Sequence, residues 1–145
     1  MDFRLHSVIK IIDVKRFYEM LFLKNRSDIP IPVEKKFRAV FRRPVGVEWM
    51  VTGNDYEALF HENKLEHIAR FDGSGNLIEL RTNIAPLDMA SIKNEQVRMM
   101  GTLMNYIQIW HADTTTHELI IKKPDLTRIL VLLNDNYDII KEEPL

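Results

Sequence analysis

Cysteine is absent from this 145-residue chain. Its absence excludes disulfides, thiolate metal ligands and cysteine-based catalysis. The chain also lacks an excess of charge of one sign, because its formal net charge at pH 7 is −1. Such a chain has no overall field that would attract nucleic acid or acidic membranes. We therefore expect neither as a partner.

Long apolar runs are missing too, since no stretch approaches the ~20 apolar residues that cross a membrane. Near the N-terminus, Asp2, Lys10, Asp13 and Lys15 interrupt the apolar residues. A cleavable export signal needs an unbroken apolar region of about 7–15 residues. The sequence therefore predicts a cytoplasmic protein without a membrane span. A native start further upstream would make the protein periplasmic instead.

Known catalytic motifs are also missing. The sequence contains no Gly-rich phosphate loop and no HExxH or GxSxG motif. Its carboxylates are scattered, so their spacing indicates no acid–base pair. We therefore expect a protein that is not an enzyme, with no catalytic residue, no cofactor and no resident metal.

What the chain does contain is an internal repeat. Trp49 and Trp110 are 61 positions apart, and Asp72 and Asn134 are 62 positions apart. In each copy an amphipathic stretch leads into four short runs with strand-like alternation. We expect one domain (1–145) with three parts: an N-terminal segment and loop (1–32), a first repeat (33–84) and a degenerate second repeat (85–145).

The apolar spacing predicts the elements of each part. The first repeat should hold a helix over 33–42 and strands over 45–51, 56–61, 65–71 and 77–84. The second should hold a longer helix over 89–104 and strands over 105–112, 117–123, 127–133 and 137–142. In the N-terminal segment, 14–24 favours a helix, and 3–12 fits a helix or a strand. The connections are too short for parallel crossovers, so we predict an α+β fold with an antiparallel sheet and helices packed on one face.

The order of motifs in the first repeat resembles a known family. A short helix ending in Phe41-Arg-Arg-Pro44 is followed by Glu48-Trp49, then Asp55-Tyr-Glu-Ala-Leu-Phe60, then Phe71-Asp-Gly-Ser-Gly-Asn-Leu77. This succession is similar to the PepSY-like, β-lactamase-inhibitor-protein-like proteins of bacteria, whose function is unknown. The resemblance covers 33–84 well and 89–145 more weakly. It implies a tandem helix-plus-four-strand repeat forming one curved sheet.

The resemblance carries no activity to any residue, because the family takes its name from its shape. The chain also departs from the pattern in three ways. Arg43 stands before Pro44, and the second copy lacks the hairpin glycine. Typical members also carry an export signal, which is not evident in this sequence.

Two patterns admit a metal. His61 and His67 flank a hairpin, but a two-residue turn at Asn63-Lys64 would point their imidazoles to opposite faces; a register change of one residue would bring them together. The loop from Asp72 to Asn76 has oxygen donors at alternate positions, as a calcium loop does, but lacks the glycine and bidentate glutamate of an EF-hand. We favour solvated histidines and a plain turn.

The first repeat should present an open sheet face. Its helix-covered face should carry Val47, Trp49, Val51, Tyr56, Ala58, Phe60, Ala69 and Phe71. The other face should carry mixed charges and a few apolar anchors. The candidate recognition residues on it are Glu48, Met50, Glu57, Leu59, His61, Arg70, Glu79 and Arg81, with Ile68 beside them.

The second repeat should differ, because its opposite face gathers aliphatic side chains. These are Ile107, Ile109, Ile120, Leu130, Leu132 and Ile139. An exposed apolar patch of this size marks an interface, so we expect it to be covered, by residues 3–24 or by a second copy of the protein in a homodimer. The remaining alternative is that the register assumed here is wrong.

These patterns favour a non-enzymatic module that recognises a protein or peptide through the open sheet face. The alternative is a small-ligand or metal-binding protein, or a small enzyme, with a pocket near Trp49, Tyr56, His61 and His67. A cluster of lysines and arginines at 35–36 and 42–43 indicates a solvated helix face, with an acidic partner or nucleic acid as the alternatives.

Overall fold

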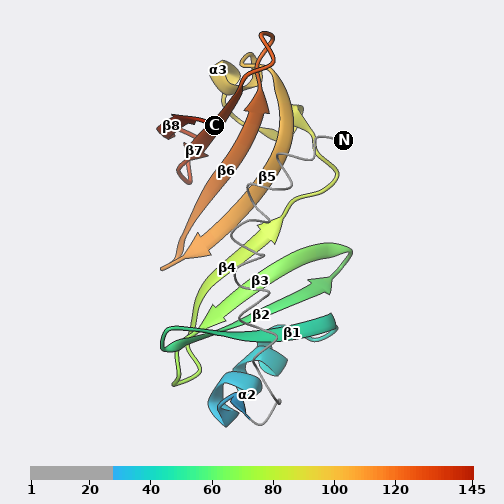
Figure 1. The fold of residues 1–145 in the computed structure, drawn as a ribbon, viewed down its shortest axis with the longest axis vertical. Helices are drawn as coiled ribbons and strands as arrows, with labels where there is room; N and C mark the ends of the chain where they lie inside the picture. Colours follow the sequence, from blue (N-terminus) through green and yellow to red (C-terminus); the bar gives the residue numbers. More distant parts are fainter. Residues whose placement is uncertain (1–27) are drawn as a thin grey trace. The chain divides into compact units, whose positions relative to one another are not determined.

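The computed structural model describes residues 28–145. In this part of the chain eight strands form an antiparallel sheet in which they follow one another in chain order, from β1 to β8 (Figure 1). The chain divides into two compact units, Met1–Leu80 and Arg81–Leu145. Each is described by itself below.

The first unit contains α2 (Ile31–Val40), β1 (Val45–Thr52), β2 (Asp55–Glu62) and β3 (Leu65–Phe71), and β4 (Leu77–Asn83) begins in it. Pro30 starts the helix, because its carbonyl accepts hydrogen bonds from the amides of Val33 and Glu34. The helix ends where Phe41 turns to extended backbone. The strands fall close to the ranges that alternation predicts.

The core of the first unit is aromatic. Phe37 on α2 lies edge-on to Phe60 on β2, with ring centroids 5.1 Å apart. Ala58 and Ala69, which pair across β2 and β3, are fully buried beneath this cluster. Small residues at these positions leave room for the phenyl rings, as interlocking of large and small side chains requires. The predicted helix-covered face is therefore confirmed at Ala58, Phe60, Ala69 and Phe71, with Val47, Trp49 and Tyr56 packed beside them.

Tight turns set the register of the hairpins. Asn63 and Lys64 both have positive φ, 53° and 66°, and Ala112 and Asp113 repeat this with 49° and 62°. Two consecutive residues of positive φ are the mark of a type I′ turn, whose twist matches that of antiparallel strands. The predicted Asn63-Lys64 turn is confirmed.

The second unit contains a short 3₁₀ helix η2 (Met89–Ser91), α3 (Glu95–Arg98), β5 (Thr102–His111), β6 (Thr114–Lys122), β7 (Arg128–Leu133) and β8 (Ile139–Pro144). The predicted helix over 89–104 is wrong in its length. Asn94 caps a single turn by accepting a hydrogen bond from the amide of Val97. The backbone of Gly101 then passes so close to the carbonyl of Lys122 that no Cβ would fit, and Leu103 and Met104 belong to β5.

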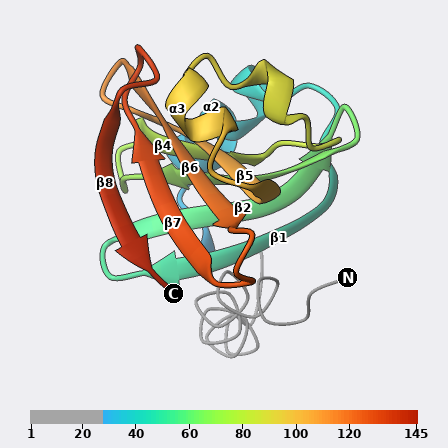
Figure 2. The ribbon, with the colours of Figure 1, turned by 90° about the horizontal axis from the view of Figure 1, so that it is seen from above.

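The core of the second unit is aliphatic and forms on the α3 side of β5 to β7 (Figure 2). Ile92 and Val97 pack on Leu119, Ile121 and Val131, and all five are fully buried. Tyr106 and Leu103 complete this core from β5.

The antiparallel sheet is thus confirmed, in a fold that is mostly sheet with few helices. The tandem repeat and the curvature of the sheet stay predictions. The expectations for 3–12 and 14–24 lie outside the described residues. Within the described part of the chain, no helix has the length and apolar content that a membrane crossing needs.

Candidate functional site

Strand register assigns the residues of the candidate recognition face. Leu59 on β2 pairs with Glu48 on β1 and with Ile68 on β3, and Glu57 pairs with Met50 and Arg70. Paired residues in an antiparallel sheet share a face, and neighbours along a strand alternate. We call the side of β1–β3 opposite the aromatic core the sheet face. It carries Glu48, Met50, Glu57, Leu59, His61, Ile68 and Arg70.

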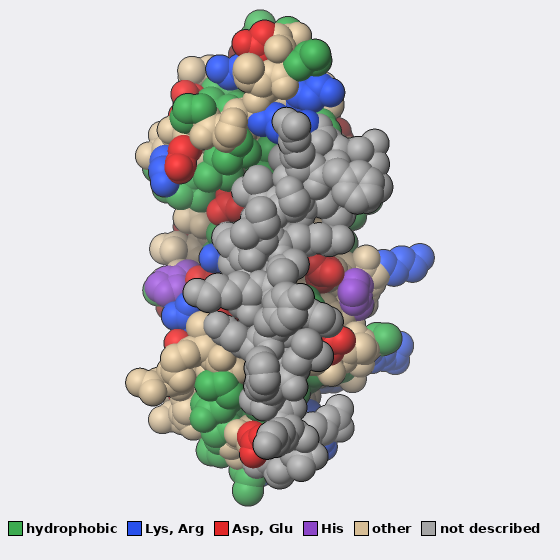
Figure 3. All heavy atoms as spheres, in the orientation of Figure 1, with side chains coloured by type: hydrophobic (Ala, Val, Ile, Leu, Met, Phe, Trp, Pro, Cys, Tyr) green, Lys and Arg blue, Asp and Glu red, His purple; other side chains and the backbone are tan. Residues whose placement is uncertain are grey.

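Exposure on the sheet face is uneven. Glu48 and His61 are exposed, and Leu59 and Arg70 are half-buried. Met50 and Glu57 are only 2% and 1% exposed, so neither is the solvent-facing residue that the sequence led us to expect. Glu79 is half-buried on β4, and Arg81, also half-buried, belongs to the second unit. The side of the molecule drawn in Figure 3 shows acidic, basic and hydrophobic side chains intermixed.

Ion pairs orient the charged groups of the sheet face. Arg70 Nε lies 3.1 Å from Asp55 Oδ2, with both side chains partly exposed. His61 Nε2 lies 3.9 Å from Glu66 Oε2, a contact that is an ion pair only when the imidazole is protonated, and both of these side chains are more exposed. Pairs of this kind contribute about 0–1 kcal/mol. Their effect is to set where each charge is presented rather than to hold the fold.

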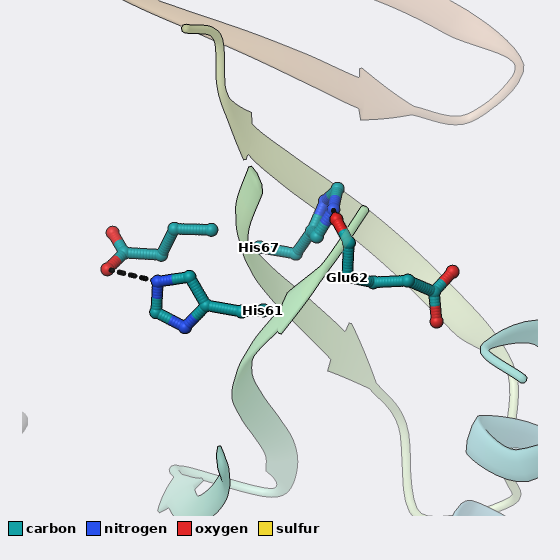
Figure 4. A network of polar contacts seen from close by, with 4 residues as sticks. His61, Glu62 and His67 are labelled. Carbon is teal, nitrogen blue, oxygen red and sulfur yellow. Dashed lines mark hydrogen bonds and ion pairs between the residues drawn. The ribbon is translucent and has the colours of Figure 1, made fainter. Parts of the chain in front are cut away.

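The two hairpin histidines do not form a joint site. His61 pairs with Glu66, whereas His67 pairs with Phe60. Figure 4 shows their side chains pointing away from each other. His67 stacks on Phe60, with ring centroids 5.3 Å apart, and its Nε2 lies 3.3 Å from the backbone oxygen of Glu62. The prediction that the imidazoles point to opposite faces is confirmed.

The four residues named for the alternative pocket do not all lie on one face of the sheet. Trp49, Tyr56 and His67 lie on the core side of the sheet, and His61 lies on the sheet face. Three of the four residues therefore share one side of the sheet, and His61 is the one that points away from them. Trp49 instead lines a cavity of ≈ 160 Å³ between α2 and β1, together with Glu34, Phe37, Arg38, Pro44 and Val47. Sequence reasoning missed this cavity, because it depends on how α2 packs on the core side of β1.

Hydrogen bonds within the loop use both carboxylate oxygens of Asp72. Asp72 Oδ1 accepts hydrogen bonds from the amides of Ser74 and Asn76 at 2.9 and 3.0 Å, and Oδ2 accepts one from the Asn76 side chain. The Asn76 side chain is also the main cause that lowers the pKa of Asp72. Gly75 adopts a φ of 90°, as the predicted turn requires. Among the described residues there is no group of three or more His, Asp or Glu side chains arranged to hold a metal ion.

The aliphatic face of the second unit is found where alternation places it, with one correction. Ile107 and Ile120 are buried, and Ile109, Leu130 and Leu132 are half-buried. Ile139 is not on this face. A register shift between Leu132 and Leu133 pairs Ile139 with Leu133, so it packs against the core instead. We also expected residues 3–24 to cover this face, but these residues lie outside the described part of the chain.

A buried polar cluster in the second unit escaped the sequence analysis. The Tyr106 hydroxyl and His117 Nδ1 are 2.6 Å apart, and His117 stacks on Tyr137 with ring centroids 4.3 Å apart. Burial lowers the pKa of His117, while Asp135 acts in the opposite direction. The pKa of Tyr106 is raised to about 12, mainly by burial and secondly by the neighbouring Tyr137. Both rings are therefore held in their neutral forms.

No known family profile matches the chain. No curated protein matches it either.

Solved structures do share its fold. A protein from Bacteroides eggerthii, predicted to be periplasmic, has a TM-score of 0.67 at 16% identity, covering 79% of this chain and 88% of that one. A DUF2874 family protein from Bacteroides uniformis has a TM-score of 0.64 at 18% identity, covering 79% and 88%. A BLIP-like protein from Bacteroides fragilis has a TM-score of 0.62 at 9% identity, covering 79% and 84%. The predicted resemblance to β-lactamase-inhibitor-protein-like proteins is confirmed at the level of the fold, whereas none of the comparisons supports a cytoplasmic location.

Proposed function

We propose that the first unit is a non-enzymatic binding module that recognises a protein or peptide through the sheet face. The observation that carries this proposal is the composition of that face. Glu48 and His61 are exposed around Leu59 and Ile68, which are half-buried. Protein interfaces combine an apolar centre with a polar rim of this kind. The fold shared with a BLIP-like protein supports a binding role.

Charge reversal at exposed positions tests the proposal. In the variant Glu48→Lys/His61→Glu both altered residues are exposed, so the fold should tolerate them. Glu57 is unsuitable, because it is 1% exposed and reversing its charge would change the interior of the protein rather than its surface. The matched control is Glu142→Lys/Asn136→Glu, which makes the same change of net charge at exposed positions of the second unit.

The readout is quantitative mass spectrometry of proteins captured from an extract of the native cell. A partner of the sheet face should be retained by the wild type and by the control, and reduced at least about tenfold, or ~1.4 kcal/mol, by the variant. Equal capture by all three proteins would contradict the proposal.

We infer a periplasmic rather than a cytoplasmic location. The support is a neighbour in fold that is itself predicted to be periplasmic. Release of the protein from native cells by osmotic shock, with a cytoplasmic enzyme retained, would agree with this inference. Retention together with the cytoplasmic enzyme would contradict it.

Self-association through the aliphatic face of the second unit is a second candidate. Ile109, Leu130 and Leu132 lie together on it and are half-buried. Burial of such side chains in a homodimer is favourable by roughly 25 cal/mol per Å². Sedimentation velocity at micromolar concentration should then show a dimer that Leu132→Glu dissociates, whereas a wild-type monomer would exclude it.

A further inference from the structure

An unpaired sheet edge lies along β1. This strand stands at one end of the strand order, and among the described residues it pairs only with β2. In an antiparallel strand every second residue turns its N–H and C=O away from the partner strand. The outer side of β1 therefore presents hydrogen-bond donors and acceptors.

The C-terminal half of this edge has no feature that blocks pairing. Natural edges are usually protected by proline, by lysine or by a bulge. In β1 the irregularity lies between Val45 and Glu48, and pairing with β2 is regular from Glu48 to Thr52. That stretch, Glu-Trp-Met-Val-Thr, contains one charge and no proline or lysine.

A cavity of ≈ 160 Å³ lies where the irregular start of β1 meets this regular stretch, with Val47 and Trp49 in its lining. Phe37, Val47 and Trp49 form its apolar wall, and Glu34, Arg38 and Pro44 complete it. Phe37 lies edge-on to Trp49, with ring centroids 5.1 Å apart. An apolar cavity of about 150 Å³ holds a benzene ring. The space next to β1 is therefore large enough for one phenyl or leucyl side chain.

The surroundings of the cavity are basic, although the whole chain has a net charge of −1. Between positions 34 and 48 the exposed cations are Lys35, Lys36, Arg38, Arg42 and Arg43. The carboxylates in that range are Glu34 and Glu48, and Glu62 on β2 accepts a hydrogen bond from the amide of Arg43, so the cations remain in excess. The partner that this charge complements is acidic.

We propose that the β1 edge binds an extended acidic segment of another protein. The segment adds a strand to the sheet and places one aromatic or large aliphatic side chain in the cavity beside Trp49. In this mode of recognition, main-chain hydrogen bonds give affinity and side-chain pockets give specificity. The site does not depend on the sheet face, because Val47 and Trp49 lie on the opposite side of the strand.

The test uses a fluorescein-labelled peptide of sequence Asp-Glu-Val-Phe-Val-Glu-Asp and the full chain at low salt. Binding should appear in fluorescence anisotropy. It should also shift the emission of Trp49, which the Trp110→Phe variant leaves as the single tryptophan. Three changes should each weaken binding at least about tenfold: phenylalanine to alanine in the peptide, N-methylation of alternate peptide amides, and Arg38→Glu/Arg42→Glu in the protein.

Lys64→Glu/Lys123→Glu is the matched control, because it removes two exposed cations elsewhere and should leave binding unchanged. No binding at 1 mM peptide, or equal binding of the N-methylated peptide, would overturn the proposal. A peptide with the sequence of residues 138–145, which include the acidic strand β8, tests whether the segment bound at the edge comes from a second copy of this chain. If it binds more tightly than the probe and the protein also forms oligomers, the partner is a second copy and the proposal fails.

Discussion

Tyr137 occupies the same position in its hairpin loop as Gly75 does in the loop 62 residues earlier, and both residues have positive φ, 63° and 90°. Asn134 Oδ1 accepts hydrogen bonds from the amides of Asn136 and Asp138, just as Asp72 Oδ1 accepts them from Ser74 and Asn76. The two loops therefore share one plan of hydrogen bonds. A bulky residue at positive φ is uncommon and strained, so Tyr137 needs a compensating contact, which its stacking on His117 provides.

Substitutions at Tyr137 should separate backbone strain from ring packing. Tyr137→Ala loses the stacking on His117 and keeps the strained φ, whereas Tyr137→Gly loses the stacking and relieves the strain. We expect the free energy of unfolding to fall in the order wild type, Gly variant, Ala variant, with the last two about 1 kcal/mol apart. Urea unfolding checks this order. An alanine variant as stable as the glycine variant would show that φ carries no cost here.

Gly75→Ala should destabilise the first unit far more than Gly53→Ala. Both glycines have positive φ, but a Cβ on Gly75 would lie 2.5 Å from the carbonyl oxygen of Pro32, whereas nothing lies within 4 Å of one on Gly53. We expect a loss of about 1 kcal/mol at Gly53 and at least ~2 kcal/mol at Gly75. Thermal unfolding of the two variants provides the comparison, and equal shifts in Tm would contradict it.

Acidification should destabilise the second unit through His117. The pKa of His117 is lowered in the folded state, and the unfolded chain takes up a proton near the ordinary value of 6.5. Between these two values the unfolded state binds more protons, so the free energy of unfolding falls as the pH falls. Urea unfolding of the wild type and of His117→Gln, measured at pH 7.5 and pH 5, should show a larger loss for the wild type. Equal losses of unfolding free energy in the two proteins would mean that His117 does not contribute to the pH dependence.

Register was the most predictable feature of this fold. Because side chains alternate along a strand, the Asn63-Lys64 turn was enough to place His61 and His67 on opposite faces and Ala58 opposite Ala69. The same reasoning gave the wrong face for Ile139, because a register shift precedes its pairing with Leu133. Nothing in the alternation of β7 and β8 indicates that shift.

Features that depend on tertiary contacts were not predictable. Leu103 and Met104 continue the helical spacing of the preceding residues, yet they lie in β5, because the approach of Gly101 to Lys122 starts the strand there. The burial of Glu57 was not predictable from alternation either, because alternation gives the face of a residue and not its exposure. Tyr106 and His117 lie on the two strands of one hairpin, but their hydrogen bond also depends on the conformations of the two side chains. On the candidate site, the alternation predicted from the sequence agrees with the register of β1–β3 for Glu48, Met50, Glu57, Leu59, His61 and Arg70. It could not say which of these side chains are exposed.

Site-specific photocrosslinking in the native cell tests the binding role of the sheet face most directly. A photoreactive phenylalanine analogue would replace His61 on the sheet face, and Lys123 in the second unit as the control; both residues are exposed. If the sheet face recognises a protein, ultraviolet light should produce a discrete covalent adduct from position 61 and none from position 123. No adduct from position 61, or the same adducts from both positions, would contradict the account.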